Sequence, residues 1–399
     1  MAGKLGRNVV ALSGVSFLTD VATEMIYPLL PLFLSSVLGA NASFIGAIEG
    51  AAESTASLLK LASGWWSDKV KRRKPLIVLG YGIATFVRPF VAMATSAGAV
   101  LAIRVADRVG KGIRGAPRDA LLADSADPNA RGRAFGFHAS ADNAGAVLGP
   151  LIAFALLRYF DLSLRSVFWL AAVPGLLALI VLVVAVREVP RESASAGLES
   201  DTAPHIAPAE TMGKRFWAYL GVVLLFTLGN STDAFLLLRA NQLGVAIVLA
   251  PILWAMLNFV KASAGTLGGA LSDRLGRKPL IVCGWILYAA VYVGFSRATE
   301  AWHAWALFAV YGLFYALTEG TEKALVADIV PRAKRGAAYG WYNLAIGLGA
   351  LPASLIFGAI WDRVSPDAAF LFGAALAMIA ALAMAVVAPG RPGRTAVAT

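Results

Sequence analysis

Five polar side chains interrupt the first apolar stretch of this 399-residue chain: Ser13, Ser16, Asp20, Glu24 and Tyr27. Their spacing places all five on one face of a helix. Carboxylates are costly in lipid, so Asp20 and Glu24 must face a protein interior or a water-filled cavity. A carboxyl group in such a place can bind and release a proton, and we predict that this pair carries protons. The alternative is a structural pair that neighbouring Arg or Lys residues neutralise.

A stripe of charges occupies the apolar stretch near residues 98–124. At about 100° per residue, roughly 120° of the helix surface holds Arg104, Asp107, Arg108, Lys111, Arg114 and Arg118. Such a face cannot contact acyl chains, so it must line a polar interior. Cations outnumber acids in this stripe, and Arg binds carboxylate or phosphate groups through two parallel hydrogen bonds. The stripe therefore predicts a site for an anionic substrate.

Two other accounts of the stripe stay open. In the first, Asp107 and Asp119 neutralise their neighbours, and the stripe is structural. In the second, carboxylates from facing helices neutralise it and leave a cavity suited to zwitterionic or cationic compounds. Those carboxylates would be Asp20, Glu24, Glu319 and Glu322. The stretch near 301–329 inverts the charges of the stretch near 98–124, which predicts ion pairs between the two.

Other charged residues in apolar stretches are also interior candidates. Asp142 and Asp233 join the predicted substrate and proton pathway, while Glu49 and Glu53 could form structural ion pairs. The sequence has no nucleophile–base arrangement, no spaced metal ligands and no Gly-x-x-x-x-Gly-Lys-Ser/Thr loop. We therefore expect no catalytic residues, no metal and no cofactor, and a proton gradient as the energy source. An intramembrane enzyme and a non-transporting receptor are the remaining alternatives.

The elements that position these residues are long apolar windows. The chain is 58% hydrophobic and 15% charged, which is more apolar than soluble proteins are. Windows long enough to cross a hydrocarbon core as helix lie near 9–37, 43–66, 75–96, 98–124, 132–158, 165–187, 216–239, 244–271, 279–297, 301–329, 337–360 and 367–389. They lack the alternation that barrel strands need. We predict an all-α integral membrane protein of twelve spans, with an N-terminal bundle over 1–187, a linker over 188–213 and a C-terminal bundle over 214–399.

The two halves follow one plan. The segment Gly64-Trp-Trp-Ser-Asp68, with a basic cluster and Lys-Pro-Leu-Ile-Val after it, returns as Gly269-Ala-Leu-Ser-Asp273, 205 residues later (273 − 68). Each copy joins two apolar windows. These loops resemble the signature loop of the major facilitator superfamily, a family of secondary transporters. The resemblance implies two pseudo-symmetric six-helix bundles, a central cavity, and alternating access by rocking of one bundle against the other.

The same resemblance implies a set of gating residues at one end of the bundles. They are Gly64, Asp68, Arg72, Arg73, Asp124, Gly269, Asp273, Arg277 and Asp328. In the family, an acid at the end of the fourth or tenth helix pairs with the arginine of the signature loop. Asp124 would pair with Arg72 or Arg73. Asp328 would pair with Arg277.

Two further helices carry the resemblance. Arg104, Gly110 and Gly112 match the pattern of the family's fourth helix. In the fifth helix, Gly145, Gly149 and Pro150 resemble the motif of its proton-driven drug antiporters. The small residues there predict close helix packing. This motif implies efflux of a small organic compound by antiport, and proton-coupled uptake of a small metabolite is the alternative.

The distribution of basic residues predicts the topology. Lys and Arg gather in the loops on one side, together with both signature loops and both terminal segments. The positive-inside rule places that side in the cytoplasm. The net charge of +11 therefore reports topology and indicates no nucleic-acid partner. We expect a multi-pass monomer in the cytoplasmic (inner) membrane, whose partners are the lipid bilayer, protons and a small-molecule substrate.

Overall fold

The computed structural model describes residues 6–70, 72–126, 131–188, 212–331 and 335–387, and every regular element in these ranges is a helix. The first half contains α1 (Arg7–Glu24), η1 (Tyr27–Leu29), α2 (Leu30–Ser36), α3 (Ala42–Lys69), α4 (Lys74–Val87), η2 (Arg88–Met93), α5 (Ala97–Ser125), α6 (Arg131–Tyr159), α7 (Leu164–Leu170) and α8 (Ala172–Ala185). The second half contains α9 (Lys214–Gly229), α10 (Ala234–Gln242), η5 (Ile247–Leu249), α11 (Ala250–Leu275), α12 (Arg277–Arg297), α13 (Ala301–Ile329), α14 (Arg335–Arg363) and α15 (Pro366–Val387).

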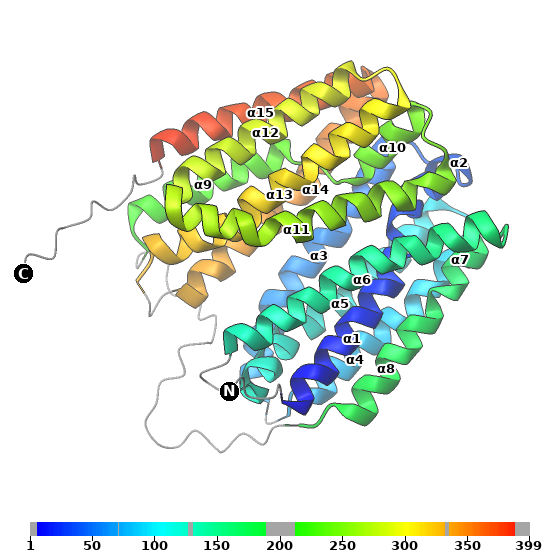
Figure 1. Cartoon of the computed structure of the whole chain (residues 1–399), viewed down its shortest axis with the longest axis vertical. Coiled ribbons are helices and arrows are strands. Elements are labelled where there is room, and N and C mark those ends of the chain that lie inside the picture. Colours follow the sequence, from blue (N-terminus) through cyan, green and yellow to red (C-terminus); the bar gives the residue numbers. More distant parts are fainter. Residues whose placement is uncertain (1–5, 71, 127–130, 189–211, 332–334, 388–399) are drawn as a thin grey trace, which may run out of the picture.

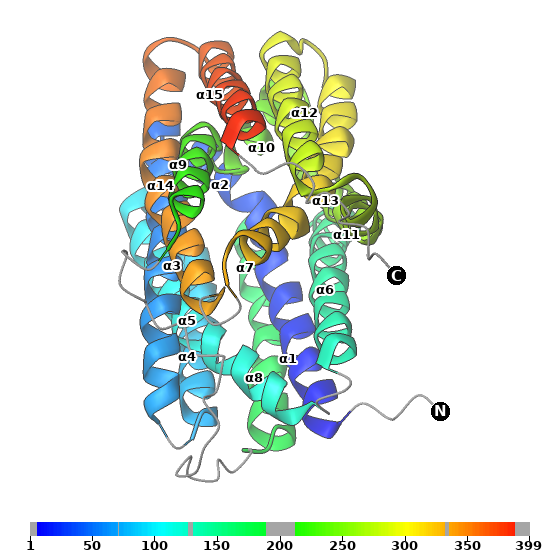
Figure 2. The ribbon, with the colours of Figure 1, turned by 90° about the vertical axis from the view of Figure 1, so that its left-hand side faces the viewer.

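These elements form the twelve spans that the sequence predicts, with boundaries that differ by about one helical turn or less. Each half of the chain supplies six of these spans, and the two halves form two bundles (Figures 1 and 2). The predicted linker falls largely outside the described residues. Within them, α8 ends at Ala185 and α9 begins at Lys214, so each bundle is made from one half of the sequence.

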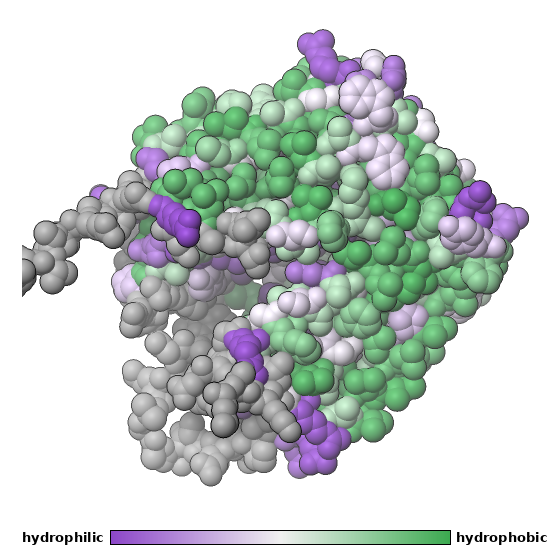
Figure 3. All heavy atoms as spheres, in the orientation of Figure 1, coloured by the Kyte–Doolittle hydropathy of each residue, from purple (hydrophilic) through white to green (hydrophobic). Residues whose placement is uncertain are grey.

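On the face shown in Figure 3, apolar side chains cover most of the described surface, and hydrophilic residues gather toward the ends of the bundles. In the described part of the chain, nine spans are long and apolar enough to cross a membrane on composition alone. The other three long helices are α3, α5 and α13, which carry most of the charged residues that the sequence places inside spans. Because lipid cannot accept these charges, the three helices must turn their polar faces into the protein.

The first and seventh spans are interrupted in the middle. α1 ends at Glu24 and α9 at Gly229, and these two positions are 205 residues apart (229 − 24), the distance between the sequence repeats. In the seventh span, Tyr288 Oη donates to the Gly229 carbonyl oxygen at 3.1 Å, and Ser231 Oγ lies 3.2 Å from Tyr292 Oη. Backbone groups freed at a break need such partners inside a membrane protein. The breaks therefore place irregular backbone between the two bundles.

The bundles meet at the end of the molecule opposite the signature loops, which we call the far end. There the Asp362 carboxylate at the end of α14 accepts hydrogen bonds from the backbone amides of Ala42 (3.0 Å) and Ser43 (2.8 Å), the first residues of α3. Toward the signature loops, which define the signature-loop end, α6 and α11 draw apart (Figure 1). The structure is thus closed at the far end, with its bundles spread at the signature-loop end.

The helices α3 and α14 form a seam between the two bundles. A Cβ atom added to Gly50 would lie 2.8 Å from Leu351 Cα, and one added to Gly358 would lie 2.7 Å from Ser43 Cα. Such distances leave no room for a side chain. Glycine at these positions lets the two backbones touch, as small residues do where membrane helices pack closely.

Candidate substrate and proton site

A cavity of about 470 Å³ lies between the bundles, within the usual size range of small-molecule sites. α3 and α5 line it from the first half, and α9, α13 and α14 from the second, together with the two breaks. Its charged lining residues are Glu49, Glu53, Arg108, Asp233, Glu319, Glu322 and Lys323. Acids thus outnumber cations on the cavity wall.

Arg104 does not line this cavity. Its guanidinium donates to both oxygens of Glu49, from Nε at 3.0 Å and from Nη2 at 2.6 Å. Asp107 lies between two arginines, with Oδ1 2.8 Å from Arg88 Nη2 and Oδ2 3.8 Å from Arg104 Nη1. All four side chains are buried. Arg104 and Asp107 therefore belong to a closed ion-pair network inside the first bundle and do not line the cavity, an arrangement that agrees with the structural alternative for the stripe.

The signature-loop half of the stripe is also turned away from the cavity. Arg114 is buried with its guanidinium 4.1 Å from the centroid of the Tyr81 ring. Arg118 donates to Asp119 at 2.8 Å and to Ser16 Oγ at 3.1 Å. Among the described residues of the stripe, only Arg108 lines the cavity. The charge pattern therefore overstated how much of this face meets a substrate.

Close packing around α5 explains this outcome. A Cβ atom on Gly110 would lie 2.5 Å from the Gly80 carbonyl oxygen of α4, and one on Gly112 would lie 2.5 Å from Leu59 Cβ of α3. Two neighbouring helices thus press against α5 on either side. A charged stripe about 120° wide is shared between these two contacts and the cavity, so Arg104 and Arg114 are buried against their own bundle.

The proposed proton carriers lie on α1. In the described structure, Asp20 has no basic partner within the 4.0 Å of an ion pair. Its charged surroundings are Glu24, Lys111, Arg118 and Asp142. Asp142 itself lies 3.9 Å from His138 Nε2. Asp20 and Asp142 are therefore two acids that face each other across the contact of α1 with α6.

Glu24 reaches the other bundle. Its Oε2 accepts a hydrogen bond from Trp254 Nε1 of α11 at 2.7 Å. The Tyr27 ring packs on the same indole, with 4.9 Å between ring centroids. Arg108 and Lys111 are near Glu24 without forming an ion pair with it in the described structure. A predicted proton carrier is thus joined directly to the partner bundle.

Neutral donors hold two acids of the second bundle. Asp233 Oδ1 accepts from Tyr311 Oη at 2.7 Å, and Oδ2 accepts from Tyr315 Oη at 2.9 Å. Glu322 likewise accepts from Trp285 Nε1 at 2.9 Å and from Tyr342 Oη at 2.6 Å.

Glu319 instead pairs with Lys261 at 3.0 Å and with Lys323 at 3.7 Å, both in its own bundle. The predicted ion pairs between the stretches near 98–124 and 301–329 do not occur among the described residues. The physical reason is that each of these helices finds its partners within its own bundle.

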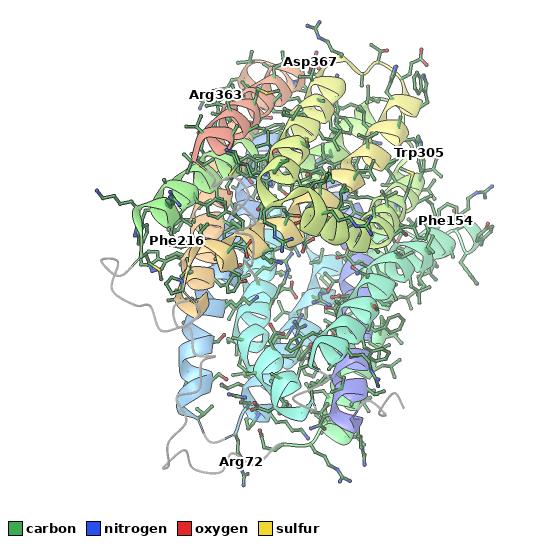
Figure 4. The ribbon with its side chains drawn as sticks, turned by 60° about the vertical axis from the view of Figure 1, so that its left-hand side comes forward. Arg72, Phe154, Phe216, Trp305, Arg363 and Asp367 are labelled. Carbon is green, nitrogen blue, oxygen red and sulfur yellow. The ribbon has the colours of Figure 1, made fainter. Side chains whose placement is uncertain are left out.

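At the signature-loop end, each bundle has the expected arginine–acid pair. Arg73 binds Asp124, and Arg277 Nε lies 3.3 Å from Asp328 Oδ2. Arg72, the other candidate partner of Asp124, points away from the bundle (Figure 4). Gly64 lies in α3. The side chains of Asp68 and Asp273, and the surroundings of Gly269, fall outside what the structure describes, so their gating role stays a prediction.

The fifth-helix glycines allow α6 to touch α1. A Cβ atom on Gly145 would lie 2.6 Å from the Phe17 carbonyl oxygen, and one on Gly149 would lie 2.6 Å from the Val21 carbonyl oxygen. Pro150 follows inside α6. The predicted close packing is present, and it falls beside the face of α1 that carries the two acids.

The repeated bundles, the broken spans and the central cavity agree with the comparison to known proteins. The profile of the Major Facilitator Superfamily matches residues 12–262 and 240–398. The chain belongs to the Major Facilitator Superfamily. This membership makes it a multi-pass membrane transporter of the twelve-helix fold.

Individual relatives within the Major Facilitator Superfamily differ in how much of the chain they match. An uncharacterised MFS-type transporter of Methanocaldococcus jannaschii is 34% identical over 385 residues, covering 95% of this chain and 94% of its own length. The multidrug resistance protein MdtH of Yersinia enterocolitica is 30% identical over 157 residues, 38% of each chain. The crystal structure of a bacterial homologue of the lysosomal transporter Spinster, inward-facing and unoccupied, covers 97% of this chain and 96% of its own, with a TM-score of 0.73 and 17% identity.

The neutral hydrogen-bond donors that bind the buried acids of this superfamily member could not be identified from the sequence alone. In the sequence, Trp254, Tyr311 and Tyr315 cannot be told from ordinary apolar or interfacial residues, because aromatic rings are large apolar groups that any membrane span can contain. Arg88 could have been found. It stands alone in the apolar stretch near 75–96, and an isolated cation there needs a buried acid.

Proposed function

We propose that this Major Facilitator Superfamily transporter exports a small organic compound from the cell in exchange for protons. The signature-loop end would face the cytoplasm, as the basic loops favour. The described structure would then be an inward-open state, closed toward the outside by the contact of Asp362 with α3. Alternating access follows if the bundles rock so that the far end opens and the signature-loop end closes.

The observation that carries proton coupling is the pair of acids on α1. Neither Asp20 nor Glu24 has a basic partner within ion-pair distance in the described structure. A membrane protein keeps such acids where they serve an ion or proton pathway. Glu24 also contacts the second bundle through Trp254, so a change in its charge would be felt by the element that moves.

The observation that favours efflux is the fifth-helix motif with its contact to α1. The 38% of the chain that matches a multidrug resistance protein points the same way. A growth screen of an efflux-deficient host against diverse toxic compounds would identify a transported compound. Expression of the chain should raise resistance to at least one compound.

The coupling is tested with that compound in inverted membrane vesicles. Uptake driven by a pH gradient should disappear in the double variant Asp20→Asn with Glu24→Gln, while exchange of labelled for unlabelled compound continues. Asp367→Asn, at the far end and paired with Arg239 of its own bundle, is the matched control and should behave as wild type. Uptake that is unchanged when the pH gradient is collapsed would rule out proton coupling.

A further inference from the structure

Asp233 differs from the other acids of the central cavity. It lies at the break of the seventh span and lines the cavity while only partly buried. Among the described residues no basic side chain is within ion-pair distance of it. Lys261, which contributes to its electrostatic surroundings, is bound to Glu319 at 3.0 Å. Asp233 is thus a carboxylate that the protein leaves without a counter-ion.

The hydrogen-bonding capacity of Asp233 is only half used. An ionised carboxylate offers about four lone-pair sites. Tyr311 and Tyr315 occupy one on each oxygen and fix the orientation of the group. Two acceptor sites are left, and because Asp233 lines the cavity, a ligand there can donate N–H groups to its carboxylate.

Aromatic faces surround the same space. Tyr27, Phe226, Phe314 and Tyr315 all line the cavity. A cation is attracted to the face of an aromatic ring, most strongly where water is excluded. Tyr27 comes from the first bundle and Asp233 from the second, and Asp233 contributes to the electrostatic surroundings of Tyr27. A cation bound at Asp233 would therefore lie between the two bundles.

The remaining cavity charges favour the same ligand. Arg104 neutralises Glu49, and two lysines neutralise Glu319. Among the described lining residues, Glu53, Asp233 and Glu322 have no ion-pair partner, and Arg108 is the one lining cation without an ion-pair partner. Glu322 is 9% exposed and already bound by two donors. Glu53 is exposed, but its charged surroundings are Lys111, Arg108, Arg104 and Lys60. Asp233, with only Lys261 near it among the described cations, is therefore the accessible acid that nearby cations compensate least.

We propose that Asp233 is the subsite for a protonated amine, and that the substrates are small organic amines with an apolar body. The ammonium group donates to the free acceptor sites of Asp233, and the apolar body packs against the aromatic lining. This inference rests on the proposed export function and names its substrate class. The cavity volume of about 470 Å³ limits such a substrate to a small molecule.

The test compares three probes that share one apolar body: 4-phenylbutylamine, 4-phenylbutanol and 4-phenylbutyrate. At neutral pH they carry a positive charge, no charge and a negative charge. Binding to the full-length wild-type protein in lipid nanodiscs is measured by calorimetry. The amine should bind saturably and at least about tenfold more tightly than the alcohol, as a hydrogen bond to a charged group contributes, and the carboxylate should bind most weakly.

Variants locate the subsite. Asp233→Asn keeps the size of the side chain and should weaken binding of the amine by about tenfold or more, with little change for the alcohol. Glu322→Gln is the matched control, because it removes the other unpaired acid of the second bundle and should weaken amine binding much less. Thermal unfolding of each variant confirms that it is folded. The wild-type comparison of the three probes needs no variant.

Several outcomes would overturn the inference. These are no saturable binding of the amine, equal binding of amine and alcohol, or equal losses in Asp233→Asn and Glu322→Gln. The proposed export function has a separate readout. If vesicles exchange protons for 4-phenylbutyrate, export stands and the amine subsite falls. If the amine binds at Asp233 but no compound moves against its gradient with protons, the subsite stands and the export proposal falls.

Discussion

The charged residues inside the spans form two groups. One group forms ion pairs within the first bundle, and the other lines the cavity. Arg104 belongs to the first group, since its side chain and that of Glu49 are only 6% and 7% exposed. Its double hydrogen bond with Glu49 turns the guanidinium toward α3, and Arg104 is not among the residues that line the cavity. We therefore assign to this arginine a structural role in place of the predicted substrate contact.

Arg104→Gln should destabilise the protein by about 3–5 kcal/mol, because it leaves the Glu49 carboxylate buried without its partner. Adding Glu49→Gln should restore much of the loss, because no unpaired charge remains. Thermal unfolding of purified protein measures both variants. If the single variant unfolds at the wild-type temperature but binds substrate poorly, Arg104 is a substrate ligand after all.

Contact between helix backbones decides how the helices pack. α6 contacts α1 through Gly145 and Gly149, which keeps the acids of α1 in a fixed position relative to Asp142. A side chain at either glycine would meet backbone atoms, which cannot move aside without moving the helix. The fifth-helix motif is thus a constraint on the spacing of two helices.

Gly149→Ala should destabilise the protein by about 1–3 kcal/mol through overpacking and should reduce proton-coupled flux. Gly136→Ala is the matched control in the same helix, because nothing lies within 4 Å of a Cβ atom added there. Thermal unfolding and vesicle uptake are measured for both. Equal behaviour of the two variants would show that the contact with α1 is unimportant.

At this scale most of the fold could be predicted from the sequence. Apolar windows mark membrane spans because lipid imposes one composition on all of them, and the repeated segments around Asp68 and Asp273 reveal the two halves. The partners of the fourth-span charges could not be predicted. Helical spacing says which residues share a face, but it does not say which helix that face meets. The isolated Arg88 and the acid Glu49 could be recognised as ion-pair candidates from the sequence, but not as the partners of Asp107 and Arg104.

The whole molecule is held closed at the far end by few polar contacts. Asp362 accepts from two backbone amides at the N-terminus of α3, where a carboxylate is favoured by the free amides and the helix dipole. Because these bonds join the two bundles, they must break when the far end opens.

Asp362→Ala should therefore shift the population toward open far ends by roughly tenfold, as loss of a helix cap permits. Spin labels on Val37 and Val364, both exposed and on different bundles, report the distance by pulsed electron resonance in a Cys283→Ser background. Asp367→Ala, whose partner Arg239 is in the same bundle, is the control. An unchanged distance distribution in Asp362→Ala would show that this contact does not hold the far end closed.

The seam of α3 and α14 bears on the speed of the transport cycle. At Gly50 and Gly358 the two bundles meet backbone to backbone, so rocking about this line disturbs few interlocked side chains. The seam would then act as a pivot for the rocking motion. The step that limits the turnover number would be another step of the transport cycle. A methyl group at Gly358, which does not line the cavity, would collide with the backbone of α3. Gly358→Ala should therefore slow turnover, while the affinity for substrate stays the same.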